Sequence, residues 1–203
     1  MTITAQTLSW IPLSIYLCSA IPQFATNIRR KSAAGVSHWM LFMRVASGIF
    51  YNSYLFLCLL PLAHRTIMPL YSGSLAILAI QGYWLEPDKN VRWRLRWAYS
   101  SVLLGVGIGL VYAWAEPQRV GMLFGWIGVA IALFCDWPQI YHNWHRKSVQ
   151  GFNFLFASGI GVGALIEMCI AYWFSLPLPT LANPLRAFMH YLVYCTQFLL
   201  YRA

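Results

Sequence analysis

The chain contains one polar motif twice, at a fixed distance along the sequence. The first copy begins with Pro22 and Gln23, and the second begins with Pro138 and Gln139, 116 residues later. The same offset joins the later positions of the two copies: Asn27 and Asn143, Arg30 and Arg146, Lys31 and Lys147, Ser32 and Ser148, Gly35 and Gly151, and further downstream Gln81 and Gln197. A constant offset without an insertion indicates two copies of one structural unit.

The composition indicates that the solvent of this chain is mostly lipid. Of its 203 residues, 60% are hydrophobic and only 9% are charged, whereas a soluble domain carries about 25% charged residues. Seven apolar stretches have roughly the 20 residues that a helix needs to cross a bilayer. They are Leu8–Ile28, His38–Leu60, Ile67–Leu85, Trp97–Trp114, Gly121–Tyr141, Phe152–Phe174 and Leu181–Tyr201. We therefore expect an all-α membrane protein with seven transmembrane helices.

The repeat divides these helices into two groups of three and one extra helix. Residues 1–85 form the first three-helix repeat, and residues 121–203 form the second. Residues 86–120 hold a basic loop and the fourth span, which carries no copy of the motif. A unit of three spans ends on the side of the membrane opposite to its start, so a second unit fused directly to it would be inverted. The extra span restores the original direction of the chain. The two bundles are therefore predicted to be parallel, in a 3+1+3 layout with an inversion linker helix.

The basic residues predict the orientation in the membrane. Ten Lys and Arg residues, including Arg202 after the last span, fall on one side of the predicted spans. The other side has Arg65 and Arg119, and Arg186 near the start of the last span can be counted with them. By the positive-inside rule the N-terminus is outside and the C-terminus is cytoplasmic. The net charge of +9 is explained by this asymmetry and by anionic lipid headgroups, so no nucleic-acid partner is expected.

Several absences in the sequence complete this picture. We expect no cleaved signal peptide, since no basic residue precedes the first span, which also carries the motif. No Asn-x-Ser/Thr acceptor occurs, which favours a bacterial inner membrane over a lysosomal membrane. Neither a metal cluster nor a phosphate loop nor a nucleophile motif is recognisable, so we expect no cofactor, no metal and no enzymatic activity. The sequence does not predict an oligomeric state.

The doubled motif, seven spans and an outside N-terminus resemble the PQ-loop transporter family. Both copies read Pro-Gln-x3-Asn-x2-[Arg/Lys]-Lys-Ser-x2-Gly. That family includes cystinosin-like and lysosomal cationic amino-acid exporters and is related to the SWEET and SemiSWEET sugar transporters. The resemblance implies a span order of 1-3-2 in each half, alternating access, and a small solute that is often moved with a proton.

The two Pro-Gln pairs are candidate hinges. Proline removes a backbone hydrogen bond and bends a helix, so Pro22 and Pro138 would provide matched pivots in the two halves. Single prolines are also tolerated in membrane helices without a function. Gln23 and Gln139 could bond the carbonyls that the bend frees, or face the solute path.

Four further amides are candidate residues of the solute path. Asn27 and Asn143 follow the glutamines by one helical turn and are candidate solute-binding residues near the cytoplasmic end, or interfacial residues. Gln81 and Gln197 are also candidates for the solute path, although interhelical hydrogen bonds are the alternative.

Two buried acids are the candidates for proton coupling. Glu167 lies roughly 22 Å into its span when counted from Phe152 at 1.5 Å per residue. Acids at this depth are costly and mark ion or substrate paths by default. Asp136 precedes Pro138 by two residues and shares a face with Asn143. The alternative role for either acid is a buried ion pair with Arg44. For Asp136, a His near the cytoplasmic end is a second alternative partner.

Three polar residues of the second span complete the set. Arg44 could reach back to the interface, pair with Asp136 or Glu167, or hold a substrate carboxylate. Tyr51 occupies the position of Glu167 in the first repeat, with Asn52 beside it. The two halves therefore differ at their centre, as an asymmetric solute would require.

These features predict a transporter of a small polar solute. A cationic or zwitterionic amino acid with proton coupling is favoured by the two buried acids, and the solute, protons and membrane lipids are the expected partners. The alternatives are a SWEET-type sugar transporter and a non-transporting receptor similar to the KDEL receptor.

Overall fold

The computed structural model describes residues 3–32, 35–85 and 88–201. Arg202 and the predicted boundary at residue 86 lie outside the described residues. In the described part of the chain, all regular secondary structure is helical, with these elements: α1 Ile3–Arg30, α2 His38–Leu57, α3 Leu62–Leu85, α4 Lys89–Ala113, α5 Pro117–Cys135, α6 Trp137–Arg146, α7 Phe154–Trp173 and α8 Leu178–Leu200.

The fifth span consists of two helices, because α5 ends and α6 begins on either side of Asp136. Pro138 explains this break, since it lacks an N–H group and its ring crowds the carbonyl of Phe134 four residues earlier. The matching Pro22 lies inside the continuous helix α1. The two predicted pivots are therefore equivalent in sequence but differ in local structure.

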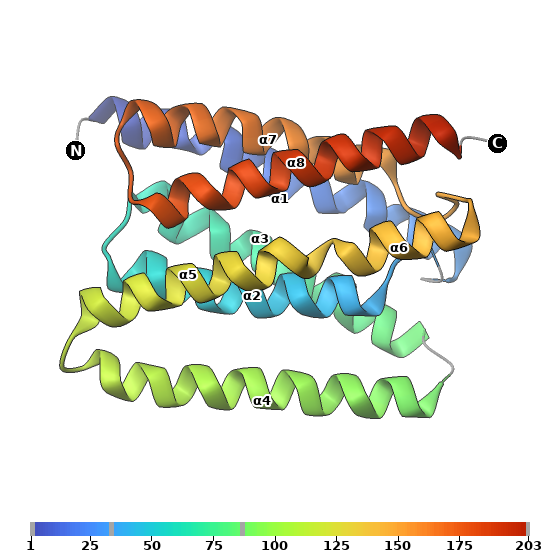
Figure 1. The fold of residues 1–203 in the computed structure, drawn as a ribbon, viewed down its shortest axis with the longest axis horizontal. Coiled ribbons are helices and arrows are strands. Elements are labelled where there is room, and N and C mark those ends of the chain that lie inside the picture. Colours follow the sequence, from blue (N-terminus) through green and yellow to red (C-terminus); the bar gives the residue numbers. More distant parts are fainter. Residues whose placement is uncertain (1–2, 33–34, 86–87, 202–203) are drawn as a thin grey trace.

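Each half has the helix order expected for the family. In the first half α3 packs against both α1 and α2, and in the second half α8 packs against both α7 and α5. The halves meet where α1 packs on α7 and α2 packs on α5. Figure 1 shows α1 and the α5–α6 pair running in the same direction, with α4 crossing back along the outside of the bundle. The two halves are thus parallel, and the 3+1+3 fold is confirmed.

The helix ends differ from the predicted apolar stretches at polar positions. Lys89, Arg92, Arg94 and Arg96 were assigned to a loop, but they form the first two turns of α4. Lys and Arg favour helices, and a helix can continue beyond the hydrocarbon into the headgroup layer. The hydropathy of the sequence detects only the hydrocarbon part of such a helix.

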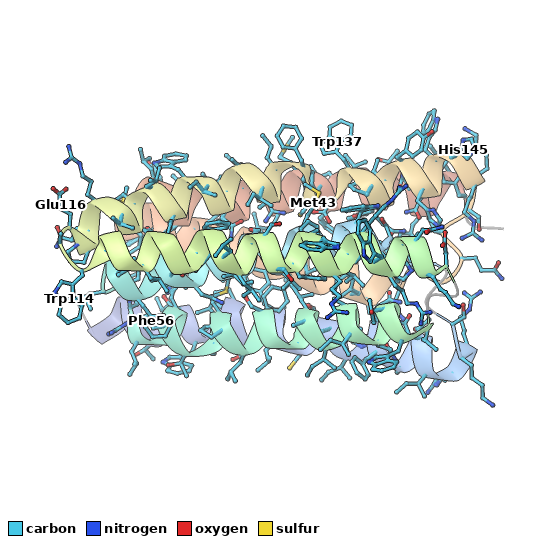
Figure 2. The ribbon with its side chains drawn as sticks, turned by 90° about the horizontal axis from the view of Figure 1, so that it is seen from below. Met43, Phe56, Trp114, Glu116, Trp137 and His145 are labelled. Carbon is cyan, nitrogen blue, oxygen red and sulfur yellow. The ribbon has the colours of Figure 1, made fainter. Side chains whose placement is uncertain are left out.

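Three helical segments of the described chain meet criteria of length and hydropathy for a membrane span: Thr7–Arg30, Pro117–Arg146 and Phe154–Trp173. The other spans carry internal polar or charged residues, such as Arg44 in α2 and His64 in α3. Figure 2 shows Trp114 and Glu116 at one end of the bundle and His145 at the opposite end. We call the end that carries Arg29, Arg30, Arg146 and Lys147 the basic end, and the opposite end the far end.

Candidate functional site

At the basic end, the glutamine of each Pro-Gln pair binds a loop of the other half. Gln23 donates from Nε2 to the carbonyl of Gly151 at 3.0 Å and accepts from the backbone N–H of Asn153 at 2.7 Å. Its side chain is fully buried. The loop between α6 and α7 is therefore fixed to α1 by hydrogen bonds that cross the interface between the halves.

The second half repeats this arrangement with the roles of the halves exchanged, so that its glutamine binds a loop of the first half. Gln139 donates to the carbonyl of Gly35 at 3.0 Å and accepts from the N–H of Ser37 at 2.6 Å. Ser37 precedes Asn153 by the same 116 residues as in the sequence repeat. We call these two sets of hydrogen bonds the glutamine clamps. They close the basic end symmetrically.

The remaining amides of the motif support the clamps. Gln23 and Gln139 each donate to the asparagine one turn later at 2.8 Å. Asn27 then donates to Gln81 and Asn143 to Gln197, both at 2.9 Å. Gln197 also donates to the carbonyl of Ile140. The two asparagines, Gln81 and Gln197 were predicted from the sequence to line the solute path, but in the structure they form hydrogen bonds within the protein. Their role in solute binding stays a prediction.

Asp136 is the centre of a buried charged cluster between the halves. It is 1% exposed and sits at the break between α5 and α6. Its Oδ1 accepts from Arg44 Nη2 at 2.5 Å and Nε at 3.1 Å, and from the hydroxyl of Tyr194 at 3.1 Å. Its Oδ2 lies 3.3 Å from Arg186 Nη1 and 2.8 Å from His190 Nδ1. We call these residues the Asp136 cluster.

Arg44 pairs with Asp136 rather than with Glu167. It reaches across the α2–α5 interface, and its guanidinium also lies 3.4 Å from the hydroxyl of Tyr71 and 5.4 Å from the ring centre of Phe156. With 9% of its surface exposed, Arg44 does not extend to the bilayer interface. Of the alternatives open from the sequence, the ion pair with Asp136 is the one that the geometry supports.

Arg186 was not among the candidates from sequence, and His190, which lies deep in the last span and could titrate there, was not assigned to this cluster. Arg186 was counted among the basic residues of the far side, whereas the structure places it within α8 against Asp136. A signal was present, because Arg186, His190, Tyr194 and Gln197 recur at helical spacing. That spacing places them on one face of a helix, and three of them join the same buried cluster.

Glu167 has two buried partners from the first half. Its Oε2 accepts from the hydroxyl of Tyr16 in α1 at 2.7 Å. Its Oε1 lies 3.4 Å from Nε2 of His64 in α3, within ion-pair distance, but the geometry is not that of a hydrogen bond. Glu167 and His64 are each only 1% exposed. The carboxyl group of Glu167 is therefore not isolated within its span. It contacts the imidazole of His64 and the phenol of Tyr16. We call these three residues the Glu167 group.

His64 was missed because the apolar stretch of the third span was taken to begin at Ile67. The helix begins five residues earlier, at Leu62. Its buried positions recur at helical spacing, and His64 continues the series formed by Ile67, Met68, Tyr71, Leu75 and Leu78. The same periodicity read three residues further back would have included it.

A small cavity lies beside the Asp136 cluster. It has a volume of about 50 Å³ and is lined by Arg44, Arg186, Tyr51, Tyr71 and Asn183, among other residues. The hydroxyl of Tyr51 and Oδ1 of Asn52 are buried without a hydrogen-bond partner among the described residues. The ring of Tyr71 stacks on that of Tyr16 with centroids 5.6 Å apart, which connects the two groups. The volume suits one or two water molecules.

The two halves differ most at this centre. Asp136 corresponds to Ala20 of the first half, Glu167 to Tyr51, and Arg186 to Leu70. The clamps at the basic end are symmetric, whereas the charges beside the cavity are not. Such a centre presents different chemistry to the two ends of a bound molecule.

The fold and this buried polar centre define a multi-span membrane protein built from two repeated three-helix units. A family model described as PQ loop repeat matches residues 4–63 and again residues 120–180. Because these two matches cover more than half of the sequence, the chain belongs to the PQ-loop repeat family.

The fold is also that of a solved transporter. The structure of a eukaryotic SWEET transporter superposes with a TM-score of 0.67, covering 98% of this chain and 95% of that chain at 12% sequence identity. At this identity the likeness establishes the fold alone. No curated protein matches the sequence. Family and fold together indicate an integral, multi-pass membrane transporter rather than an enzyme.

Proposed function

We propose that this protein carries a small zwitterionic amino acid across the membrane together with a proton. The observation that carries the proposal is the Asp136 cluster, in which Arg44 and Arg186 share one carboxylate at the interface between the halves. Alternating access requires a binding centre at such an interface.

The charges of the cluster favour a solute with a carboxylate. Two guanidinium groups face one buried acid, so the cluster has an excess of positive charge when His190 is neutral. Arg186 Nε is buried without a hydrogen-bond partner among the described residues, which leaves a donor for a ligand. Guanidinium groups bind carboxylates through paired hydrogen bonds. A solute carboxylate at this position would balance the charge, and its amino group would lie toward Tyr51 and Glu167.

We propose that Glu167 is the residue that binds and releases the coupled proton. Its partners Tyr16 and His64 belong to the first half, so Glu167 itself links the two halves. Protonation converts a carboxylate from an acceptor into a donor and weakens its attraction to a charged imidazole. Binding and release of a proton would thereby change a contact between the halves, which is the physical basis of coupled transport.

The small size of the cavity supports a mechanism in which the centre opens. Its volume of about 50 Å³ is smaller than an amino acid requires, and the clamps close the basic end. Solute entry therefore needs the halves to separate, with Pro22 and the break at Asp136 as the proposed pivots.

Transport by protein reconstituted in liposomes tests the proposal. Vesicles loaded with an unlabelled neutral amino acid, a cationic amino acid or a hexose are diluted into the labelled compound, and counterflow is followed. We expect counterflow with neutral amino acids. Counterflow with the hexose alone would identify a sugar transporter, and binding without any counterflow would identify a receptor. Either result would overturn the proposal.

The Glu167→Gln variant tests the proton. We expect uptake driven by an inward proton gradient to be lost, while counterflow without a gradient and the elution profile of the purified protein are retained. Gln keeps the size and hydrogen-bonding capacity of the side chain but does not titrate. Gradient-driven uptake equal to that of the wild type would remove Glu167 from the mechanism.

A further inference from the structure

A groove on the lipid-facing side of the bundle lies between α2, α3 and α4. It has a volume of about 430 Å³, within the range of ligand-binding pockets. Its walls are mainly apolar and include Val45, Ile49, Ala76, Ala79 and Leu103. In Figure 1, α4 is the outermost helix of the bundle. This groove is separate from the Asp136 cluster and from the glutamine clamps.

The polar residues of the groove are at the basic end. Arg96 and Tyr83 line the groove there, since α3 ends and α4 begins at that end of the bundle. Ser100 and Leu103 follow Arg96 by four and seven residues on the same helix face. The groove therefore extends about 10 Å from the guanidinium toward apolar residues in the middle of the bundle.

Two further cationic residues lie on the face of α4 that lines the groove. Arg92 precedes Arg96 by four residues and Lys89 precedes it by seven, so all three lie on the face that carries Ser100 and Leu103. Among the described residues, neither Arg92 nor Arg96 has a carboxylate within ion-pair distance. Asp88, at the start of α4, is the acid nearest in sequence and accepts from the backbone N–H of Asn90.

Two tryptophans place this part of α4 at headgroup level. Trp93 and Trp97 flank Arg96, their ring centres are 5.9 Å apart, and they are 63% and 58% exposed. Exposed tryptophans of membrane proteins concentrate at the interface between hydrocarbon and headgroups. Arg96 is thus at the depth of the lipid phosphates, and the apolar walls of the groove are at the depth of the acyl chains.

We propose that this groove is a binding site for an anionic phospholipid, with the headgroup on Arg92 and Arg96 and one acyl chain between α3 and α4. Any apolar groove in a bilayer is filled by acyl chains. The cations at its interfacial end are what select a negatively charged headgroup, as basic pockets between transmembrane helices do. The site would hold α4 to the first half, because a lipid seated there contacts all three helices.

The test uses the full chain purified in a neutral detergent, with phosphatidylglycerol and phosphatidylcholine of identical acyl chains as probes. Native mass spectrometry measures the lipid that remains bound, and tryptophan fluorescence measures the unfolding temperature during a lipid titration. We expect one retained phosphatidylglycerol and a larger thermal shift with it than with phosphatidylcholine.

Arg96→Gln should weaken phosphatidylglycerol binding about fivefold. Arg94→Gln is the matched control, because Arg94 is exposed and lies two residues from Arg96, on the other side of α4. Ala79→Phe fills the groove without changing any charge, and it should also reduce retention. Folding of each variant is checked by its elution profile and by its unfolding temperature in phosphatidylcholine.

Three outcomes would overturn the proposal. Equal losses for Arg96→Gln and Arg94→Gln would show a general attraction to anionic lipid. Full retention of phosphatidylglycerol in folded Ala79→Phe would place the lipid elsewhere. A dimer in light scattering that Ala79→Phe dissociates would show that a second copy of this chain occupies the groove.

Discussion

Charged side chains in this protein occupy two different environments, and their energetic roles differ accordingly. Asp136 and Arg44 form a pair that is 1% and 8% exposed at the side chains, whereas the pair of Glu116 and Arg119 at the far end is 57% and 84% exposed. Exposed pairs are screened by water and contribute little. A buried pair that loses one partner leaves an uncompensated charge in a medium of low dielectric.

We therefore expect Asp136→Asn to lower the unfolding temperature by roughly 10 °C, because removing one partner of a buried pair costs about 3–5 kcal/mol. Asparagine keeps the shape of the side chain but cannot balance Arg44 and Arg186. Thermal unfolding in detergent, followed by tryptophan fluorescence, measures the effect. Glu116→Gln is the matched control and should change the temperature little. Equally small shifts in both variants would mean that water reaches the Asp136 cluster.

At this scale the sequence predicted the acids better than their partners. Asp136 and Glu167 were found because a carboxylate within an apolar stretch is costly and therefore conspicuous. His64 and Arg186 were not found, since each lies near the end of an apolar stretch, where a basic residue is ordinary. Their pairing depends on how α3 and α8 pack, and a single sequence contains no signal for a contact between residues 50 or more positions apart.

The helices themselves were largely predictable. Hydropathy and the constant offset of the repeat predicted seven spans, their grouping and their parallel arrangement. The starts of α3, α4 and α8 were placed three to eight residues too late, because their first residues include polar ones (His64, Lys89 and Thr180) that precede the apolar stretches. The bounds of the two repeat units at residues 85 and 121 stay a prediction.

The glutamine clamps could not be predicted, although both glutamines were singled out. Each clamp joins residues about 100 or more positions apart. The two loops that they fix also touch each other: a Cβ atom on Gly35 would lie 2.4 Å from the backbone of Gly151. Only glycine permits this approach, which explains why the repeat motif ends in glycine in both copies.

Gly35→Ala should accordingly prevent full closure of the basic end. Overpacking of this kind typically costs about 1–3 kcal/mol, which corresponds to a rise in the open population of about 5-fold to 150-fold. The measurement is the rate at which a maleimide labels a cysteine introduced at Ala157, which is 3% exposed near the start of α7, in a background without the native cysteines. We expect about tenfold faster labelling.

Gly73→Ala is the control for this experiment, because a Cβ atom on Gly73 meets no other atom within 4 Å. It should leave the labelling rate unchanged. If Gly35→Ala also leaves the rate unchanged while the protein stays folded, the loops are not part of a closing device, and the clamps serve only to hold the halves together.

On the scale of the whole molecule, charge is distributed along the bundle axis. The basic end combines Arg29, Arg30 and Lys31 at the end of α1 with Arg146 and Lys147 at the end of α6. At the far end, Arg119 is 3.0 Å from Glu116, which offsets its charge. Arg186 no longer counts toward that end, because it is part of the buried Asp136 cluster. The asymmetry between the two ends is thus larger in the structure than in the count made from sequence.

This asymmetry predicts that the basic end is cytoplasmic and that the N-terminus is outside. In Figure 1 the C-terminus lies at the same end as the loop between α6 and α7, opposite the N-terminus. A green fluorescent protein fused after Ala203 should therefore fluoresce in bacterial cells, and an alkaline phosphatase fused at the same point should be inactive. The reverse pattern would place the basic end outside. The proton gradient across a bacterial inner membrane would then reach Glu167 from the side that the glutamine clamps close.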